Sequence, residues 1–229
     1  MHVKEIWRYP VKSMAGERLD SAQMDENGVE GDRKVLVGGT NGRVITSRTH
    51  HKLLGLMGTI GPDGEARIAG PENLKAPYIW NTPEAVELVR AAVGPGAELI
   101  YYEGTERFDV LPLLVATDGA VAAFGHDGRR LRPNIVIGGV EGLAEREWPG
   151  KCLRIGKVVI GVQDLRARCV MTTYDPDTLK QNLGVLQEIV ERFDGTLALN
   201  CFVVTGGEIC VGDGVELFNG KDCGVNRAG

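Results

Sequence analysis

Turn-forming residues interrupt this sequence so often that long helices have little room to form. The chain contains 32 glycines and 10 prolines among 229 residues, and only 6% of its residues are aromatic. Such a composition is typical of short strands joined by tight turns. With 43% hydrophobic residues, the chain can also bury a substantial core in one large or two small domains. We therefore expect a folded, mixed α/β protein that is rich in β-structure.

Two hairpins are predicted in the first hundred residues. Asn41-Gly42 follows the apolar run 35–37, and Asn-Gly is a strong signal for a two-residue hairpin turn. Pro62-Asp63-Gly64 separates the apolar runs 56–60 and 66–68 in a similar way. The first part of the chain is therefore expected to form small antiparallel sheets.

Three helices are predicted from apolar spacing and capping residues. The strongest covers 83–93, where Thr82 can cap the N-terminus and Gly94 ends the pattern. A short Ala-rich helix is expected over 118–124, and residues 183–193 place their apolar side chains on one face. All three are short, which agrees with a β-rich fold.

The strand pattern begins again near Leu99, and the chain shows no internal repeat or low-complexity linker. We expect two closely packed β-rich domains, residues 1–100 and 101–229. In the second domain, residues 169–173 are expected to form a strand.

Charge and hydropathy exclude several classes of protein. A formal net charge of −5 argues against a general nucleic-acid binder, because such proteins need a basic surface to displace counterions from phosphates. No apolar segment reaches the length that spans a bilayer, and the first ten residues do not resemble a signal peptide. We expect a cytoplasmic protein without nucleic-acid or membrane partners.

The five cysteines show no Cys-x-x-Cys pair and no histidines at finger-like spacing. This pattern disfavours a zinc finger, a disulfide scaffold and a cysteine-ligated iron–sulfur cluster. We expect reduced thiols, of which at least one could be a soft metal ligand or a nucleophile.

Cys169 is the cysteine most suited to chemistry, because Arg166 and Arg168 precede it closely. Nearby positive charge favours the thiolate, which is the form that binds metals or attacks electrophiles. A small buried thiol beside solvated arginines is the ordinary alternative. The segment continues into the acidic turn Asp175-Pro176-Asp177, and loops on a rigid scaffold often carry sites. Taken alone, this turn has no functional meaning.

A phosphate cradle is predicted where Lys12 and Ser13 follow a strand that Pro10 terminates. A lysine, a hydroxyl group and backbone N–H groups can together hold a phosphate, although Lys-Ser in a loop is usually ordinary surface.

Three arginines could add donors to the same cradle from distant segments. They are Arg33, Arg48 and Arg132, each of which would alone be an ordinary surface residue. Pro133 biases Arg132 toward an extended conformation, which would hold it at the entrance of a strand.

Four separated segments together resemble one known family. They are Tyr9-Pro10-Val11-Lys12-Ser13, Gly31-Asp32-Arg33, Arg132-Pro133-Asn134-Ile135-Val136-Ile137, and the segment from Arg168-Cys169 to Asp175-Pro176-Asp177-Thr178. In this order they resemble the MOSC family, named after the C-terminal domain of molybdenum-cofactor sulfurase, and especially its amidoxime-reducing proteins. The likeness extends over nearly the whole chain.

The resemblance implies a MOSC β-barrel after a packed β-rich N-terminal domain, with a few short helices. It implies that Cys169 is a catalytic residue that ligates molybdenum, and that Asp175 lies near the metal and handles protons. The residues implied to hold the pterin and its phosphate are Lys12, Ser13, Arg33, Arg132, Asn134 and Arg168.

The function implied is that of an oxidoreductase with the molybdenum cofactor, molybdenum bound to molybdopterin, that reduces N-oxygenated small molecules. The four-cysteine iron–sulfur pattern of some relatives is absent, so electrons are expected from a separate electron-donor protein. Two alternatives remain open. One is a sulfur carrier or cofactor-delivery module without its own turnover, and the other is metal-free thiol chemistry at Cys169.

Overall fold

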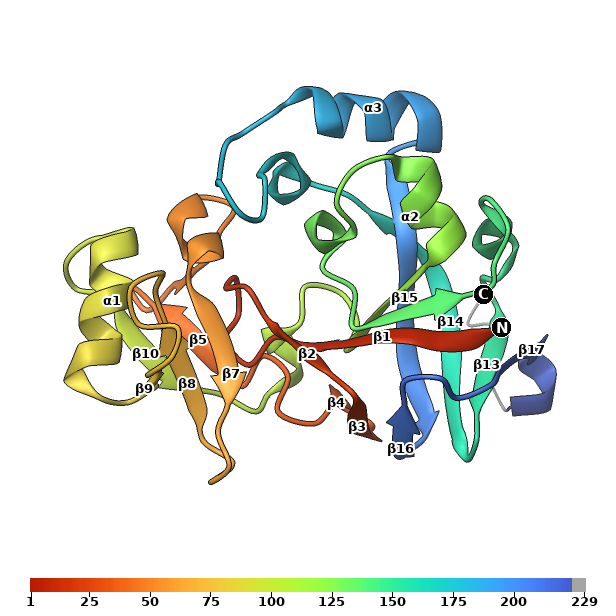
Figure 1. The fold of residues 1–229 in the computed structure, drawn as a ribbon, viewed down its shortest axis with the longest axis horizontal. Helices are drawn as coiled ribbons and strands as arrows, with labels where there is room; N and C mark the ends of the chain where they lie inside the picture. The colour runs from red at the N-terminus through yellow and green to blue at the C-terminus, as the bar shows by residue number, and fades with distance from the viewer. Residues whose placement is uncertain (224–229) are drawn as a thin grey trace.

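The computed structural model describes residues 1–223, and its centre is an eight-stranded sheet of order β17-β13-β14-β15-β11-β12-β1-β2. Neighbouring strands pair antiparallel, except β11 and β12, which are parallel. Figure 1 shows this sheet on the side of the molecule that also carries α2 and α3. The strands are β1 (His2–Arg8), β2 (Glu17–Leu19), β11 (Leu113–Thr117), β12 (Ile135–Gly138), β13 (Lys151–Ile155), β14 (Val158–Ala167), β15 (Thr196–Thr205) and β17 (Val215–Asn219).

Three small sheets of three strands each complete the β-structure. Two of them lie beside α1 at the opposite side of the molecule, which we call the first lobe (Figure 1). They are β10-β5-β6 (Glu98–Tyr101, Val35–Gly38, Val44–Ile45) and β7-β8-β9 (Met57–Ile60, Ala66–Ala69, Tyr78–Ile79). The third, β16-β3-β4 (Gly207–Cys210, Ser21–Asp25, Gly28–Val29), joins an early segment to a late one. Both predicted hairpins are confirmed, as β5–β6 and β7–β8.

The helices follow the predicted capping signals closely. In α1 (Pro83–Val93), the Thr82 hydroxyl oxygen accepts from the Ala85 N–H, and the helix ends at Gly94 with positive φ. α2 (Asp118–Phe124) and α3 (Gly184–Phe193) also confirm their predictions. The 3₁₀ helices are η1 (His51–Gly55), η2 (Thr105–Arg107), η3 (Gly128–Leu131), η4 (Ala144–Glu147), η5 (Val170–Thr173) and η6 (Gly220–Cys223).

Three clusters of buried side chains stabilise the two sides of the molecule. The largest packs inside the eight-stranded sheet and includes Ile6 of β1 and Leu153 of β13. A second, with Val37 and Val89, forms the core of the first lobe. A third holds α2 and α3 together. Each fully buried aliphatic side chain contributes about 1.5–3 kcal/mol by leaving water.

The chain crosses between the two sides more than once. β1 pairs with β12, and β3 pairs with β16, so residues near the N-terminus belong to the same sheets as residues of the second half. The family expectation of a β-rich fold is met, while the expected domain boundary at residue 100 stays a prediction.

Two local expectations are wrong. Residues 170–173 form the 3₁₀ helix η5 instead of a strand, and β14 already ends at Ala167. The reason is local, because the hydroxyls of Thr172 and Thr173 donate to the carbonyl oxygens of Cys169 and Val170, which favours a tight turn over a strand. Cys152 is disulfide-bonded, which contradicts the expectation that all thiols are reduced.

Candidate functional site

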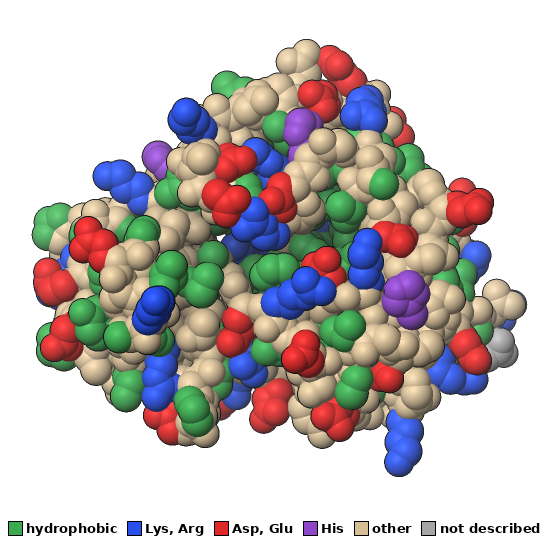
Figure 2. All heavy atoms as spheres, in the orientation of Figure 1, with side chains coloured by type: hydrophobic (Ala, Val, Ile, Leu, Met, Phe, Trp, Pro, Cys, Tyr) green, Lys and Arg blue, Asp and Glu red, His purple; other side chains and the backbone are tan. Residues whose placement is uncertain are grey.

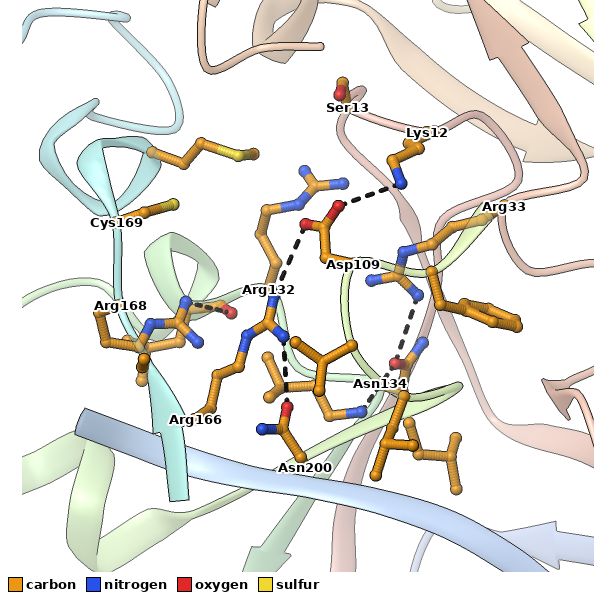
Figure 3. A pocket seen from close by; sticks show the side chains of 18 of the residues that line it. Lys12, Ser13, Arg33, Asp109, Arg132, Asn134, Arg166, Arg168, Cys169 and Asn200 are labelled. Atoms are coloured by element: carbon orange, nitrogen blue, oxygen red, sulfur yellow. Dashed lines mark hydrogen bonds and ion pairs between the residues drawn. The ribbon is translucent and has the colours of Figure 1, made fainter. Parts of the chain in front are cut away.

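A polar pocket lies where the first lobe meets the eight-stranded sheet, and its lining comes from segments far apart in the sequence (Figure 3). The space inside measures about 80 Å³. Its charged lining is almost entirely basic, with the carboxylate of Asp109 as the exception. The basic residues are Lys12, Arg33, Arg48, Arg132, Arg166 and Arg168. An arrangement of this kind attracts an anion.

Eight of the nine site residues expected from the sequence line this pocket. They are Lys12, Ser13, Arg33, Arg48, Arg132, Asn134, Arg168 and Cys169. The tertiary structure therefore brings together residues that the sequence separates by more than 150 positions. Whether they bind a cofactor stays a prediction.

Three of these residues hold their backbone in the left-handed region, which is uncommon for residues other than glycine. The φ angles are 74° at Ser13, 54° at Arg33 and 57° at Arg132. Such strain persists only where surrounding contacts impose it, and it is common at ligand sites. The expected extended conformation of Arg132 is wrong: this residue ends η3, and its N–H donates to the carbonyl oxygen of Arg129.

The ring of Tyr9 contacts the guanidinium groups of two pocket arginines. Its ring centroid lies 4.4 Å from the guanidinium carbon of Arg132 and 5.2 Å from that of Arg33. Its hydroxyl donates to the carbonyl oxygen of Pro133 at 3.1 Å. Burial raises the pKa of Tyr9 to about 12, so the ring stays neutral and attracts cations through its face.

Asn134 is already engaged by the protein. Its side-chain oxygen accepts from the N–H of Leu114 at 3.1 Å, and its amide nitrogen donates to the carbonyl oxygen of Trp7 at 3.3 Å. The residue is buried and ties β1 to the segment that opens β11. This geometry gives Asn134 the role of holding the pocket wall.

Arg168 places a poorly satisfied positive charge in the pocket wall. Its Nη2 donates to the carbonyl oxygen of Leu131 at 2.8 Å, whereas its buried Nε and Nη1 find no partner in the described residues. Burial, followed by the repulsion from Arg166, lowers the pKa of Arg168 to about 10, which still leaves it charged at neutral pH. A buried donor without an acceptor is costly, and an anion would relieve that cost.

Cys169 is free, half-buried, and next to Arg168 at the start of η5. Figure 3 shows its sulfur directed into the same space as the basic side chains. Met171 also lines this space, where it accepts a hydrogen bond from the Ser47 hydroxyl at 3.4 Å. The pocket thus combines one thiol with a wall of cations.

Asp109 was missed at the sequence level, together with Asn200, and Arg166 was considered only as a neighbour of Cys169. The Asp109 carboxylate lies 3.0 Å from Lys12 Nζ, 3.0 Å from Arg48 Nη2 and 3.5 Å from Arg166 Nη2. Burial by itself would raise the pKa of Asp109, but the surrounding cations outweigh burial and hold it below its usual range. Nothing in the sequence near Asp109 signals these contacts, because its partners come from three distant segments.

Asp175 does not line the pocket. Its carboxylate accepts from Arg130 at 2.9 Å and from the N–H and hydroxyl of Thr178 at 2.9 and 3.0 Å. The hydrogen bonds from Thr178 lower the pKa of Asp175 most, and the positive charge of Arg130 lowers it further. Arg130 also donates to the carbonyl oxygen of Thr172, so Asp175 helps to fix the η5 turn that follows Cys169. Its expected proton-handling role stays a prediction.

The outer face is mixed in charge. Figure 2 shows a hollow near the centre of the face seen in Figure 1, with acidic and basic side chains gathered around it. Arg129 is one of the charged residues of the molecule's surface, and it pairs with Asp127 and Asp177.

No helix among residues 1–223 is long and apolar enough to cross a membrane.

The fold and the pocket define a β-rich protein with an anion-attracting site around one free thiol. The chain belongs to the MOSC-domain proteins: residues 1–92 match the MOSC N-terminal beta barrel domain, and residues 120–216 match the MOSC domain.

The chain is also similar to known proteins in sequence and in fold. The chain is 25% identical to human mitochondrial amidoxime-reducing component 1, in an alignment that covers 77% of this chain and 67% of the relative. It is also 25% identical to human mitochondrial amidoxime reducing component 2, with the same shares covered. The crystal structure of the YUAD protein from Bacillus subtilis shares the fold, with a TM-score of 0.51, 12% identity and 95% of each chain covered.

The residues of the pocket fit the cofactor that the family implies. The unpartnered nitrogens of Arg168 are donors without an acceptor in the described residues, which suits an anionic ligand. The thiol of Cys169 suits a soft metal such as molybdenum. The donor set and the thiol therefore agree with a phosphorylated metal–pterin ligand.

Proposed function

We propose that this protein is a molybdenum-cofactor-binding oxidoreductase that reduces N-oxygenated small molecules with electrons from a separate redox protein. One observation carries the proposal: the free thiol of Cys169 shares a pocket with the buried, partly unpartnered guanidinium of Arg168. A thiol alone would suit many reactions, and a basic pocket alone would suit many anions. Their combination fits a metal held beside a phosphorylated pterin.

The residues of the pocket would divide the binding task between them. Cys169 would ligate the metal, and Arg168 would donate to the anionic part of the pterin through Nε and Nη1. Arg132, held in place over Tyr9, offers a guanidinium that makes no hydrogen bond to an acceptor in the described part of the chain. Lys12 and Arg48 line the same pocket, and both contact Asp109.

When bound, the cofactor would supply the two-electron chemistry that removes oxygen from an N–O bond. The protein's own part is to orient the ligands and to hold charge in place. The basic wall favours an anionic cofactor, and it disfavours a cationic group close to Arg166 or Arg168 by charge repulsion. The names of the two human relatives, both amidoxime-reducing components, support N-oxygenated substrates and a system of several proteins.

The test is to express the protein in cells that make the molybdenum cofactor, and to measure molybdenum and pterin in the purified protein. We expect both, together with reduction of benzamidoxime by an artificial electron donor. Cys169→Ser should lose activity and change the metal coordination. Cys210→Ser is the matched control, since Cys210 is also free and half-buried but lies on β16, outside the pocket lining. Protein without molybdenum and pterin would contradict the proposal.

A second function is favoured by the accessibility of the Cys169 sulfur, which is free and only half-buried. In this alternative the protein delivers cofactor or carries sulfur as a persulfide on Cys169, without turnover of its own. Intact-mass measurement would then detect sulfur on Cys169 and its transfer to an acceptor. Sustained benzamidoxime reduction excludes this alternative.

A further inference from the structure

One carboxylate occupies the most basic part of the pocket. Asp109 contacts Lys12, Arg48 and Arg166, and each of these cations comes from a different segment of the chain. Figure 3 shows the Asp109 side chain reaching across the space between Lys12 and Arg166. Its two oxygens therefore stand where the oxygens of a bound phosphate could make the same contacts.

The segment that carries Asp109 has ion pairs at this side chain but no backbone hydrogen bonds in the described part of the chain. Among the described residues, the backbone N–H groups of Asp109, Val110 and Leu111 make no hydrogen bond. Val110 points outward and is 55% exposed. By contrast, the preceding turn η2 is fixed, because Arg107 donates to the carbonyl oxygens of Glu103 and Gly104. A segment with few backbone hydrogen bonds opens at low cost.

The space that remains in the pocket beside Asp109 is small. Its volume is about 80 Å³. Sites for small molecules usually measure about 300–1,000 Å³. Displacement of Asp109 would enlarge this space at the point where Lys12, Arg48 and Arg166 converge. Residues 109–111 make no backbone hydrogen bond within the described part of the chain, and Asp109 places a charged side chain inside the site.

We propose that the Asp109 carboxylate is an internal stand-in for the phosphate group of the ligand, and that the ligand enters by displacing it and opening the 109–111 segment. This inference rests on the proposed function for the identity of the ligand, but its physical content concerns any phosphate group. Before loading, Asp109 neutralises cations that would otherwise repel one another. During loading, phosphate takes over the contacts to Lys12, Arg48 and Arg166, while Arg166 keeps its hydrogen bond to Asn200.

The stand-in makes loading a competition between two anions. The wild-type protein must break three ion pairs to accept a phosphate, whereas a protein without the carboxylate begins with the cations free. The empty form of such a variant should be less stable, because three like charges then face one another unpaired. With phosphate bound, the variant should lose much less stability, since the phosphate charge again neutralises the three cations.

The experiment measures binding of inorganic phosphate to the wild-type chain and to Asp109→Asn, by calorimetry at constant ionic strength. We expect phosphate to bind the variant about tenfold more tightly, because the competing charge is removed. The melting temperature of the variant should be lower without phosphate and should rise more on its addition. Asp63→Asn is the matched control, since it removes a carboxylate paired with Arg67 in the β7–β8 turn, outside the pocket.

A second measurement uses the unmodified protein, and it holds even if Asp109→Asn fails to fold. Phosphate should accelerate cleavage by chymotrypsin between Phe108 and Asp109, because the bound anion releases the segment. Phosphate binding that is equal or weaker in Asp109→Asn, binding by neither protein, or cleavage that slows with phosphate would each overturn the inference. Molybdenum and pterin analysis does not depend on phosphate binding or on cleavage of the segment. The role of Asp109 can therefore be confirmed while the proposed function is refuted, and the proposed function can be confirmed while the role of Asp109 is refuted.

Discussion

Arg168 donates one hydrogen bond to the carbonyl oxygen of Leu131, at 2.8 Å, and leaves Nε and Nη1 buried without an acceptor in the described residues. Such an arrangement costs stability in the empty protein, because the buried donors have lost water without gaining a partner. The same donors are available to bind an anion. The pocket is therefore less stable without a ligand and better able to bind one, as is common at functional sites.

Replacing Arg168 by methionine tests that trade directly. Arg168→Met should lose the pterin, while the free energy of unfolding of the empty protein should stay level or rise by about 1–3 kcal/mol, since unsatisfied buried donors are removed. Chemical denaturation of empty protein and pterin quantification after loading give the two readouts. A large loss of stability in the empty variant would contradict the prediction.

The ring of Tyr9 should matter more for anion binding than its hydroxyl does. Tyr9→Phe keeps the ring under Arg33 and Arg132 but loses the hydrogen bond to Pro133, which should cost about 1 kcal/mol of stability with little change in phosphate affinity. Tyr9→Leu removes the ring and should weaken phosphate binding as well, because Arg132 loses its platform. Equal phosphate affinity in all three proteins would refute this role of the ring.

The lowered pKa of Asp109 predicts a pH dependence of stability. A carboxylate with a folded pKa below its ordinary value of 3.8 contributes stability that is fully present above that value. This contribution is lost as the pH falls through the folded pKa. The difference in melting temperature between the wild-type chain and Asp109→Asn should therefore be largest near neutral pH and should shrink in acid. A difference that stays constant from pH 7 to pH 2 would count against the ion pairs.

Thr117 is expected to be the more important of two helix caps. Its hydroxyl oxygen accepts from the N–H of Ala120 and its hydroxyl donates to the buried carboxyl of Glu145 at 3.2 Å. Burial raises the pKa of Glu145. The hydrogen bond from Thr117 acts in the opposite direction, because it stabilises the ionised carboxylate. Thr117→Ala should cost about 2 kcal/mol, against about 1 kcal/mol for Thr82→Ala in α1. Denaturant unfolding of both variants checks the order, and the excess loss in Thr117→Ala should diminish in acid.

Asp175 is expected to act by positioning the turn after Cys169. Asp175→Asn weakens the contacts to Arg130 and Thr178 that fix this turn, so the variant should retain less molybdenum. Activity per bound molybdenum should keep its dependence on pH, because the lowered pKa already leaves the carboxylate ionised at neutral pH. Normal molybdenum content with a displaced pH profile would instead support the proton-handling role.

Sequence alone determined the elements whose signals are local. The α1 helix was predicted because its cap, its first proline and its final glycine stand within a few residues of one another. The hairpins at Asn41-Gly42 and Pro62-Asp63-Gly64 were predicted for the same reason. The chemistry of Arg168-Cys169 was also visible, since the thiol and the guanidinium are neighbours in the chain.

Only the tertiary structure decided how the site is completed. Asp109 has no local signal, because its three partners approach from other segments, and the left-handed backbone of Arg132 depends on the end of η3 and on the ring of Tyr9. The turn at η5 depends on hydroxyl groups that could equally have faced a neighbouring strand. Short-range capping and turn energies act between residues close in sequence, whereas the charge balance of a pocket is set by residues that meet only after folding.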